Sequence, residues 1–557
     1  MKKIFNSRAL ALILVLAMAV SLLTISASAT TISKVSIAEG EPVAIDWTQA
    51  GTTYTGTIVN SATLSSTVYS MPSSFTLWTE GEATFEAGTG ITVTAIGASA
   101  DETNYSYKVD VSGIASGSTA TLVVTISSGT YTVALPSATP ISAGGTKPTS
   151  VLSYAPLGQF ARGNGWGSIY SNYANVAGST ASDALVKFAT GTGYESTGVS
   201  LGAFGGYIDF YFQGGITNDA KNPYGVDFVI YGNAFNANPE AGAVQVSEDG
   251  ITWYELAGSM YYDGNFNYTG EAGASRISNA YTGTLRNARI SYSQDSVIKA
   301  TVKDASGATK INAAQFVAST AWWPTVAKGY PAIAAHINSN ATSTSNVQVT
   351  CNDTVFSSTG VTLIPDSNTT ADYAFGYADV TPNGSPATYG DAINPYTPYT
   401  SSKTGGDGFD LEWAVDITTG LPVDVTDMTF RYVRVYSAVL DNGTFGETST
   451  EICGIFTTAN KETASIGRTD APTIKFGTRT LNEVTGHQNG GYVSQTVSGS
   501  SFKVSVTSDA DNIFINGTRA TSGTAVTISK TAESNQVVRI IVQNNNQLPY
   551  VTYLKIN

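Results

Sequence analysis

Apolar and polar residues alternate along short stretches of the chain, and turns rich in glycine and serine separate these stretches. Between residues 30 and 143, the runs "SYKVDVSGI", "TATLVVTIS" and "GTYTVAL" have this period of two, and no helical period competes with it. Closely spaced runs of this kind are typical of sandwiches made from two sheets. We therefore predict an immunoglobulin-like β-sandwich over residues 30–143, followed by a linker at 144–150.

Longer and more aromatic strands are predicted over residues 151–460, for example in "GGYIDFYF", "YGVDFVIYGNAF" and "FRYVRVYSAV". The alternation pauses at Asp249-Gly250, which indicates a hairpin turn. Long connections separate the strands, so a jelly-roll-like sandwich fits this region better than a simple meander. Residues 469–557 return to short strands with a tight-turn signal at Asn516-Gly517 and predict a third sandwich. The fold class is therefore all-β, with several β-sandwich domains.

The first residues have the pattern of a secretory signal peptide. Lys2, Lys3 and Arg8 precede an apolar run, and the small residues Ala27-Ser28-Ala29 follow it. We predict a signal peptide over residues 1–29, and hence export to the cell surface or the medium. No later stretch is long and apolar enough to predict insertion into a membrane.

Charge and cysteine content narrow the classes of partner. The formal net charge is −14, and removal of the three basic residues of the signal peptide makes it −17. Such a chain should repel nucleic acid. Cys351 and Cys453 either pair after export or remain separate thiols. Because His336 and His487 are far apart in the sequence, zinc is disfavoured, and any metal is expected to be calcium.

The stretch "FDLEWAVD", residues 409–416, is the strongest candidate for chemistry. As one extended strand, it places apolar side chains on one face and three carboxylates on the other, namely Asp410, Glu412 and Asp416. Solvent, Arg431 or Arg434, or a cation must offset their repulsion. We expect first a solvated strand face. The alternatives are a salt bridge to Arg431 or Arg434, a polar ligand, or calcium, for which these three carboxylates are the predicted ligands.

Paired carboxylates also raise the possibility of glycoside hydrolysis, which needs one carboxyl group kept protonated by burial and a second one ionised. The candidates are Asp410, Glu412, Glu447 and Glu451. The sequence gives no sign that one of them is buried alone, so we predict that the protein is not an enzyme.

Aromatic and polar side chains in predicted loops are candidates for ligand binding, since sugar faces stack on Trp and Tyr. In "STAWWPT", adjacent side chains of an extended chain point in opposite directions, so one of two Trp rings should face a surface. The predicted ligand-binding residues are Trp322, Trp323, Asn233, Glu240, Trp166 and Tyr396. Ordinary packing is the alternative for each aromatic residue.

Two regions resemble known families. The segments "IFINGT", "QVVRIIVQN" and "YVTYLKIN" near the C-terminus are similar to the cadherin-like β-sandwich repeat of bacterial surface proteins, which implies a spacer or adhesion module. The central region resembles bacterial cell-surface proteins that carry a discoidin-like jelly-roll domain. That resemblance rests on six ordered blocks, at 201–212, 224–235, 239–259, 375–384, 407–416 and 430–454. It implies binding, because a few relatives are associated with glycans or cobalamin.

These patterns together predict an exported, non-catalytic binding protein whose central domain recognises an extracellular carbohydrate or another small ligand, with other surface components as further partners. The main alternative is a structural or adhesive surface component without a small-molecule site. Capture of cobalamin is a second alternative, and glycoside hydrolysis is the last.

Overall fold

The computed structural model describes residues 34–138, 146–155, 206–262, 375–397, 406–481, 491–530 and 536–557, apart from gaps of at most ten residues. It also describes a few residues between 188 and 201 and the backbone of six strands between 281 and 365. Apart from short helical turns, the regular elements of these residues are β-strands, so the prediction of an all-β chain is confirmed. The chain divides into two compact units, Met1–Ser142 and Ala143–Asn557.

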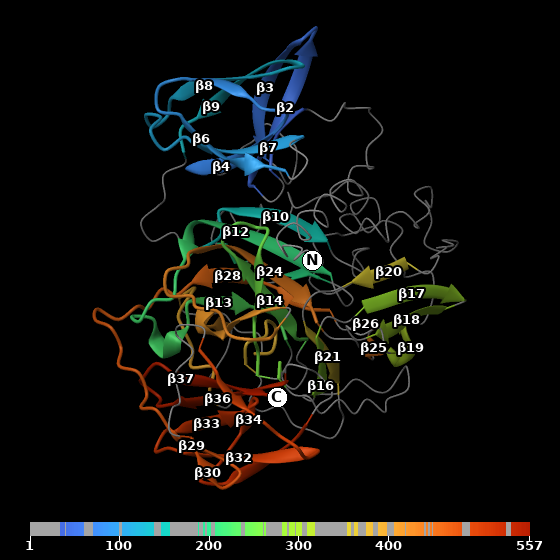
Figure 1. The fold of residues 1–557 in the computed structure, drawn as a ribbon, viewed down its shortest axis with the longest axis vertical. Helices are drawn as coiled ribbons and strands as arrows, with labels where there is room; N and C mark the ends of the chain where they lie inside the picture. The colour runs from blue at the N-terminus through green and yellow to red at the C-terminus, as the bar shows by residue number, and fades with distance from the viewer. Residues whose placement is uncertain are drawn as a thin grey trace, which may run out of the picture. The chain divides into compact units, whose positions relative to one another are not determined.

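The first unit contains two sheets around one apolar core (Figure 1). The first sheet has the order β1 (Val35–Ile37), β4 (Ser74–Glu80), β7 (Asn104–Asp110) and β6 (Thr92–Ala98). The second sheet has the order β2 (Val43–Ala50), β3 (Thr53–Asn60), β9 (Gly129–Pro136), β8 (Thr119–Ile126) and β5 (Thr84–Ala87). This arrangement is a β-sandwich, and the alternating burial of strands such as β4 shows why the period of two predicted it.

A six-stranded sheet dominates the middle of the second unit. Its order is β10 (Ser150–Ala155), β12 (Tyr207–Ile216), β24 (Phe430–Ser437), β14 (Gly242–Ser247), β15 (Trp253–Leu256) and β23 (Ala414–Asp416). The turn between β14 and β15 confirms the predicted hairpin, and Asp249 Oδ1 stabilises it by accepting hydrogen bonds from the backbone N–H groups of Ile251 and Thr252. Both faces of the central strand β12 are largely buried.

Smaller sheets accompany this one. A three-stranded sheet has the order β22 (Asp407–Phe409), β13 (Phe228–Tyr231) and β28 (Gly454–Thr457), and β11 (Val199–Ser200) pairs with β27 (Glu451–Ile452). The region between residues 281 and 365 forms a pair, β16 (Tyr281–Arg286) with β21 (Val361–Pro365), and a sheet of β19 (Thr309–Val317), β18 (Val297–Lys303), β17 (Arg289–Asp295) and β20 (Thr354–Ser357). A last pair joins β25 (Asn442–Gly443) to β26 (Gly446–Glu447).

The prediction of one continuous strand over residues 409–416 is wrong. Strand β22 ends at Phe409, a 3-10 turn covers Leu411–Trp413, and β23 then begins in a different sheet. Asp410 causes this break, because its Oδ1 accepts a hydrogen bond from the backbone N–H of Glu412 at 2.8 Å and so caps the turn. The alternation of apolar and acidic faces is lost, and Leu411, Glu412 and Trp413 are all buried.

The C-terminal residues form a further sandwich within the second unit. One sheet has the order β30 (Arg479–Thr480), β29 (Thr473–Phe476), β32 (Ser501–Thr507) and β35 (Ala525–Ser529). The other has the order β31 (Val493–Gln495), β37 (Tyr550–Ile556), β36 (Gln536–Gln543), β33 (Asn512–Ile515) and β34 (Thr518–Arg519). The predicted tight turn is confirmed, since Asn516 and Gly517 both have positive φ values, 50° and 75°.

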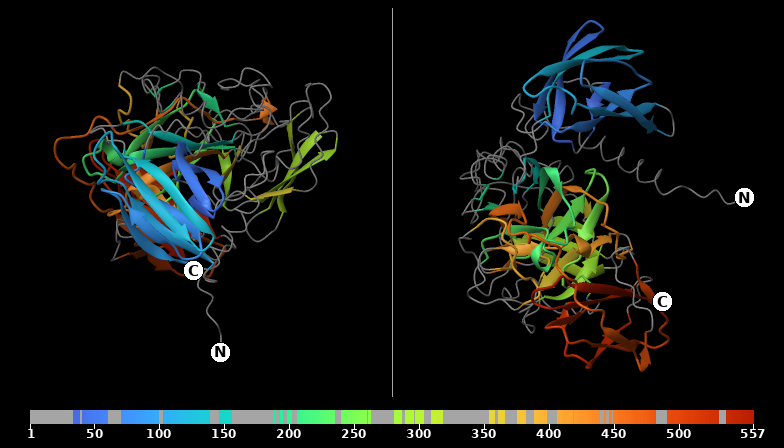
Figure 2. Two further views of the ribbon diagram at one scale, coloured as in Figure 1. Left: turned by 90° about the horizontal axis from the view of Figure 1, so that it is seen from above. Right: turned by 90° about the vertical axis from the view of Figure 1, so that its left-hand side faces the viewer.

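The C-terminal sandwich is anchored in the central domain and is not a free spacer (Figures 1 and 2). Arg539 of β36 is 1% exposed and donates hydrogen bonds to the carbonyls of Ala257 and Gly258, which follow β15. The ring of Phe514 lies 5.3 Å from that of Phe375 in the central domain. Buried contacts of this kind favour one cooperative body.

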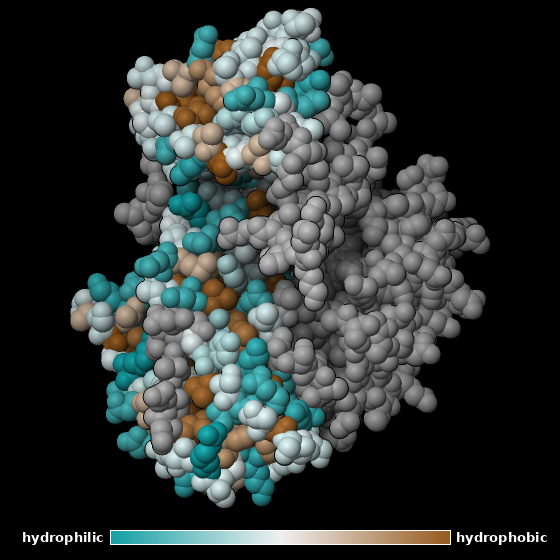
Figure 3. All heavy atoms as spheres, in the orientation of Figure 1, coloured by the Kyte–Doolittle hydropathy of each residue, from teal (hydrophilic) through white to brown (hydrophobic). Residues whose placement is uncertain are grey.

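The surface of the described residues is mixed. On the face shown in Figure 3, apolar residues lie scattered among polar ones, without one large apolar patch. The part of the chain that the structure describes contains no helix that is long and apolar enough to span a lipid bilayer.

Substitution of Gly517 tests the anchoring of the C-terminal sandwich. A Cβ atom at Gly517 would collide with the backbone carbonyl of Ser259, whereas one at Gly477, whose φ is also positive, would meet no atom within 4 Å. Both Gly→Ala variants lose about 1–2 kcal/mol through backbone strain. We expect Gly517→Ala to lose about 1–3 kcal/mol more, because the clash displaces the sandwich. Thermal unfolding would show this difference, and equal losses would contradict it.

Candidate functional site

One face of the six-stranded sheet carries a row of polar side chains. Asp209 on β12 pairs in register with Arg434 on β24, Arg434 pairs with Gln245 on β14, and Gln245 pairs with Glu255 on β15. Directly opposed residues point to the same face, so all four side chains share it. Aromatic residues stand two positions along the strands on either side of this polar row, namely Tyr207, Tyr436, Tyr211, Tyr432 and Trp253.

Arg434 is clamped between two aromatic rings at the accessible part of this face. Its guanidinium carbon lies 4.7 Å from the ring centroid of Tyr207 and 4.3 Å from that of Trp253. From the side, Asp209 accepts hydrogen bonds from Nε at 2.7 Å and from Nη2 at 2.9 Å. The Arg434 side chain is 28% exposed, and both rings are half-buried. We call Tyr207, Arg434 and Trp253 the aromatic–arginine platform.

Glu255 forms a buried floor beside this platform. Its Oε2 accepts a hydrogen bond from Gln245 Nε2, and its Oε1 accepts one from the Tyr436 hydroxyl, both at 3.0 Å. Burial raises the pKa of the Glu255 carboxyl to about 8, so this group is largely protonated at neutral pH. The polar row is therefore a neutral, hydrogen-bonded network that holds the strands and the platform in place.

Three carboxyl groups converge at a second place, where loops leave the sheets. Oxygen atoms of Glu240, Asp379 and Glu451 all lie within 4.8 Å of one another, and we call these residues the acidic triad. Asp379 Oδ1 accepts hydrogen bonds from the backbone N–H groups of Asn233 and Ala234, each at 2.8 Å. Its Oδ2 accepts one from the backbone N–H of Glu451 at 2.9 Å.

The acidic triad needs a positive charge or protons. Asp379 and Glu451 are buried, and no arginine or lysine of the described chain forms an ion pair with either of them. Burial first, and then the charge of Glu240, raise the pKa of both carboxyls well above the usual values. Carboxylate oxygens are the ligands that Ca²⁺ prefers, so this donor set can hold that ion.

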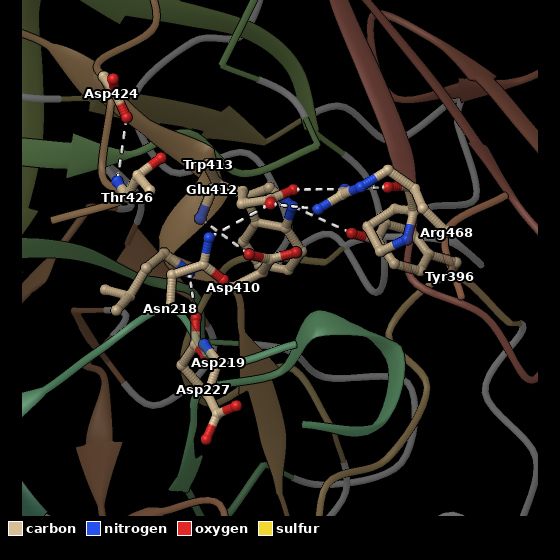
Figure 4. Close-up of polar contacts among 12 residues, drawn as sticks. Asn218, Asp219, Asp227, Tyr396, Asp410, Glu412, Trp413, Asp424, Thr426 and Arg468 are labelled. Atoms are coloured by element: carbon tan, nitrogen blue, oxygen red, sulfur yellow. Dashed lines mark hydrogen bonds and ion pairs between the residues drawn. The ribbon is translucent and has the colours of Figure 1, made fainter. Parts of the chain in front are cut away.

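The three predicted calcium ligands do not form one site. Asp410 and Glu412 lie near each other (Figure 4), but Glu412 forms a bidentate ion pair with Arg468, at 2.6 and 2.8 Å. Asp416 lies elsewhere and caps a turn, since its Oδ1 accepts hydrogen bonds from the N–H and the hydroxyl of Thr419. In the described residues, the triad replaces this set as the place where three carboxylates meet.

The structure describes three of the six predicted ligand-binding residues, and they do not form one site. Asn233 reaches the acidic triad through its backbone, and Glu240 belongs to the triad. Tyr396 is fully buried and its hydroxyl accepts a hydrogen bond from Trp413 Nε1, so it is a core residue. The remaining predicted residues, Trp166, Trp322 and Trp323, lie outside the described residues. Cys453 is buried, and Cys351 also lies outside the described residues.

Sequence reasoning missed the polar row and Asp379. The signal for the row was present, because the alternation in "YIDFYF" and "FRYVRVY" sets tyrosines and a charged residue on the same face of two strands. The strand register that places Asp209 opposite Arg434 could not be read from the sequence. The sequence around Asp379 carries no signal of this role. In the structure its carboxylate packs against Gly232, where a Cβ atom would collide with it.

The sequence comparisons do not assign this chain to a family. The sequence matches no protein-family model, and no curated protein is significantly similar to it. The functional argument therefore depends on the geometry of the aromatic–arginine platform, the acidic triad and the buried carboxyl groups near Asp410.

The Glu412–Arg468 pair provides a test of the charge balance between the central domain and the C-terminal sandwich. The Glu412 side chain is 5% exposed and that of Arg468 is 27% exposed. Arg468→Met should lose about 3–5 kcal/mol of unfolding free energy, because it leaves a buried carboxylate unpaired. The double variant Arg468→Met, Glu412→Leu should recover most of this loss. Denaturant titration measures both, and a double variant as unstable as the single one would contradict the account.

Proposed function

We propose that this protein is an exported, non-catalytic binding protein whose central domain recognises a neutral carbohydrate at the aromatic–arginine platform. The observation that supports the proposal most strongly is the position of Arg434 between Tyr207 and Trp253, held by Asp209. The extracellular location and the carbohydrate ligand are inferred from the signal-peptide pattern and from the aromatic content of this domain.

The chemistry of the platform suits a sugar. The faces of Tyr207 and Trp253 that do not cover the guanidinium would offer flat surfaces for the C–H face of a pyranose, with few rotamers to immobilise. The Arg434–Asp209 pair places donors and acceptors beside these rings, where sugar hydroxyls can exchange hydrogen bonds with them. Because the pair is neutral overall and the chain has a formal net charge of −14, a neutral sugar fits better than an acidic one.

At the platform, the spacing of the carboxyl groups argues against hydrolysis. Glycoside hydrolases place two carboxyl groups about 5–9.5 Å apart across the scissile bond. Asp209 and Glu255 stand on strands that two others, β24 and β14, separate, which corresponds to about 14 Å between backbones. Asp209 is also held by Arg434, and both Glu255 oxygens accept hydrogen bonds. Cobalamin capture and a purely adhesive role have no specific geometric support among the described residues.

We also propose that Ca²⁺ binds at the acidic triad and fixes the loops at that end of the domain. Asp379 already orders the chain after β13 through Asn233 and Ala234, so a cation there would stiffen the same segment. Its role would be structural, because no described residue of the platform belongs to the triad.

Binding of sugars tests the main proposal. A panel of neutral oligosaccharides, acidic oligosaccharides and cobalamin would be titrated against the full-length protein and followed by tryptophan fluorescence and calorimetry. We expect a neutral oligosaccharide to bind, and Trp253→Ala or Arg434→Ala to weaken binding at least tenfold, because each removes part of the platform. The matched control is Trp78→Ala, a half-buried Trp on β4 of the other unit, which should bind like wild type.

Other outcomes of this titration favour the alternatives. Binding of cobalamin alone would support the capture of that cofactor, and no response to any ligand would support a structural or adhesive role. Release of reducing sugar that Glu255→Gln abolishes would show that the protein is a hydrolase and would overturn the non-catalytic proposal.

Calcium should raise the thermal stability of the protein. We expect the unfolding temperature to rise with added Ca²⁺ and to fall with a chelator, because the ion neutralises the acidic triad. The effect should be larger at pH 8 than at pH 5, since protons compete for Asp379 and Glu451. Glu451→Gln should remove most of it, whereas Asp416→Asn should not. A midpoint that is indifferent to both additions would contradict the calcium proposal.

A further inference from the structure

Three buried carboxyl groups lie at the turn Leu411–Trp413, where the C-terminal sandwich contacts the central domain, and one of them pairs with a guanidinium (Figure 4). Asp227 is 2% exposed, Asp410 is fully buried and Glu412 is 4% exposed. Arg468 lies just before the first strand of the sandwich. It pairs with Glu412 and also donates a hydrogen bond to the carbonyl of Pro549. The single guanidinium can offset only one of the three carboxyl groups.

Asp227 is satisfied by hydrogen bonds alone. Its Oδ1 accepts from Asn222 Nδ2 at 2.6 Å and from the backbone N–H of Asp219 at 3.2 Å. Its Oδ2 accepts from the backbone N–H of Leu411 at 2.9 Å, so this carboxyl also fixes the turn that carries Glu412. Asp227 and Asp410 thus support the same short segment from its two sides.

Asp410 is the group that the described structure leaves unsatisfied. Its Oδ1 accepts the capping hydrogen bond from Glu412, but its buried Oδ2 has no hydrogen-bond partner. The wall around Oδ2 is tight, because a Cβ atom at Gly225 would lie 2.6 Å from it and 3.3 Å from Cδ of Pro549 of the C-terminal sandwich. Among the described residues, these carboxyl groups do not bring three ligand atoms within cation-binding distance, as the acidic triad does.

A proton is therefore the neutralising species that fits this place. An unpaired buried carboxylate beside two others is strongly disfavoured. Burial first, and then the charges of Glu412 and Asp227, raise the pKa of Asp410 well above its usual value. Burial raises the pKa of Asp227 to about 7. The ionisable groups that face Asp410 from the packed elements are Asp227, Glu412, Tyr396, Arg468 and Tyr553, with Arg539 beyond Tyr396.

We infer that protons held at Asp410 and Asp227 fasten the C-terminal sandwich to the central domain, so that this contact is a pH-sensitive lock. The lock is closed at mildly acidic pH, where both carboxyls are protonated. It weakens as the pH rises, because ionised Asp410 and Asp227 would repel each other and Glu412 in a buried region. The inference does not depend on the proposed sugar binding, which uses Tyr207, Arg434 and Trp253.

The sign of the pH effect follows from linkage. A carboxyl whose pKa is higher in the folded protein than in the unfolded chain binds more protons when folded. Its stabilising contribution is complete below the unfolded pKa, about 4 for Asp, and is lost as the pH rises through the folded value. For Asp227 this window extends from about pH 4 to about 7, and for Asp410 it likewise extends upward from about pH 4.

The test is the thermal unfolding of the full-length protein at pH 5.5, 7 and 8.5, with hydrogen exchange of peptides from β33 and β36 as a local readout. We expect the wild-type midpoint to fall by several degrees across this range, and exchange of these peptides, corrected for the intrinsic rate, to increase. Asp410→Asn keeps the cap and cannot ionise, so its midpoint should fall less. Asp110→Asn is the control, because a side-chain hydrogen bond from Ser112 lowers the pKa of Asp110 in the other unit.

Three results would overturn the lock. One is that neither the unfolding midpoint of the wild type nor the corrected hydrogen exchange of β33 and β36 changes between pH 5.5 and 8.5. Another is an Asp410→Asn protein with the same pH dependence as wild type; Asp227→Asn takes its place if that variant does not fold. The third is calcium at pH 8.5 that stabilises Glu451→Gln, whose triad is disabled, but not the double variant Glu451→Gln, Asp410→Asn, because a cation would then occupy the site of the proposed proton.

Discussion

The burial of carboxyl groups is the constraint on which the central domain depends. Among the described residues of this domain, eight carboxyl groups are buried, namely those of Asp209, Asp227, Glu255, Asp379, Asp407, Asp410, Glu412 and Glu451. Arginines pair with two, Asp209 and Glu412, and hydrogen bonds from backbone and side chains satisfy most of the others. Because a buried charge without compensation is so costly, each group dictates the position of the segment that compensates it.

This constraint explains how distant segments are held together. Asp379 binds the backbone after β13 and at the first residue of β27, and Asp227 binds the turn before β23. Asp407 does the same for the chain at Val380 and Thr381. Such carboxyl–backbone bonds replace regular sheet pairing where the chain leaves a strand. The aromatic–arginine platform depends on a buried carboxyl group in the same way, because the Asp209 carboxylate fixes Arg434 between two rings.

Local patterns in the sequence account for the strands and turns but not for the sites. Alternation predicted the sandwiches, and Asp249-Gly250 and Asn516-Gly517 predicted their turns, because these features depend on neighbouring residues. The pattern failed at Asp410, where a side chain captured a backbone N–H and ended the alternation. The polar row and the acidic triad unite residues separated by up to 225 positions, so only the strand register brings them together.

The same reasoning applies to the C-terminal sandwich. Its sequence motifs led us to expect a spacer module, and nothing in its local pattern indicates that Arg468 and Arg539 enter the central domain. An arginine in a strand is usually solvated, and its burial here depends on carbonyl and carboxyl groups supplied by another part of the chain. Those groups also decide which faces remain open to a ligand.

The most direct test of the account is a crystal structure of the full-length protein with a neutral oligosaccharide that binds it. The account predicts a sugar ring against Tyr207 or Trp253, with hydroxyl groups hydrogen-bonded to Arg434 and Asp209. A sugar bound at another surface, with the platform unchanged, would contradict the central claim.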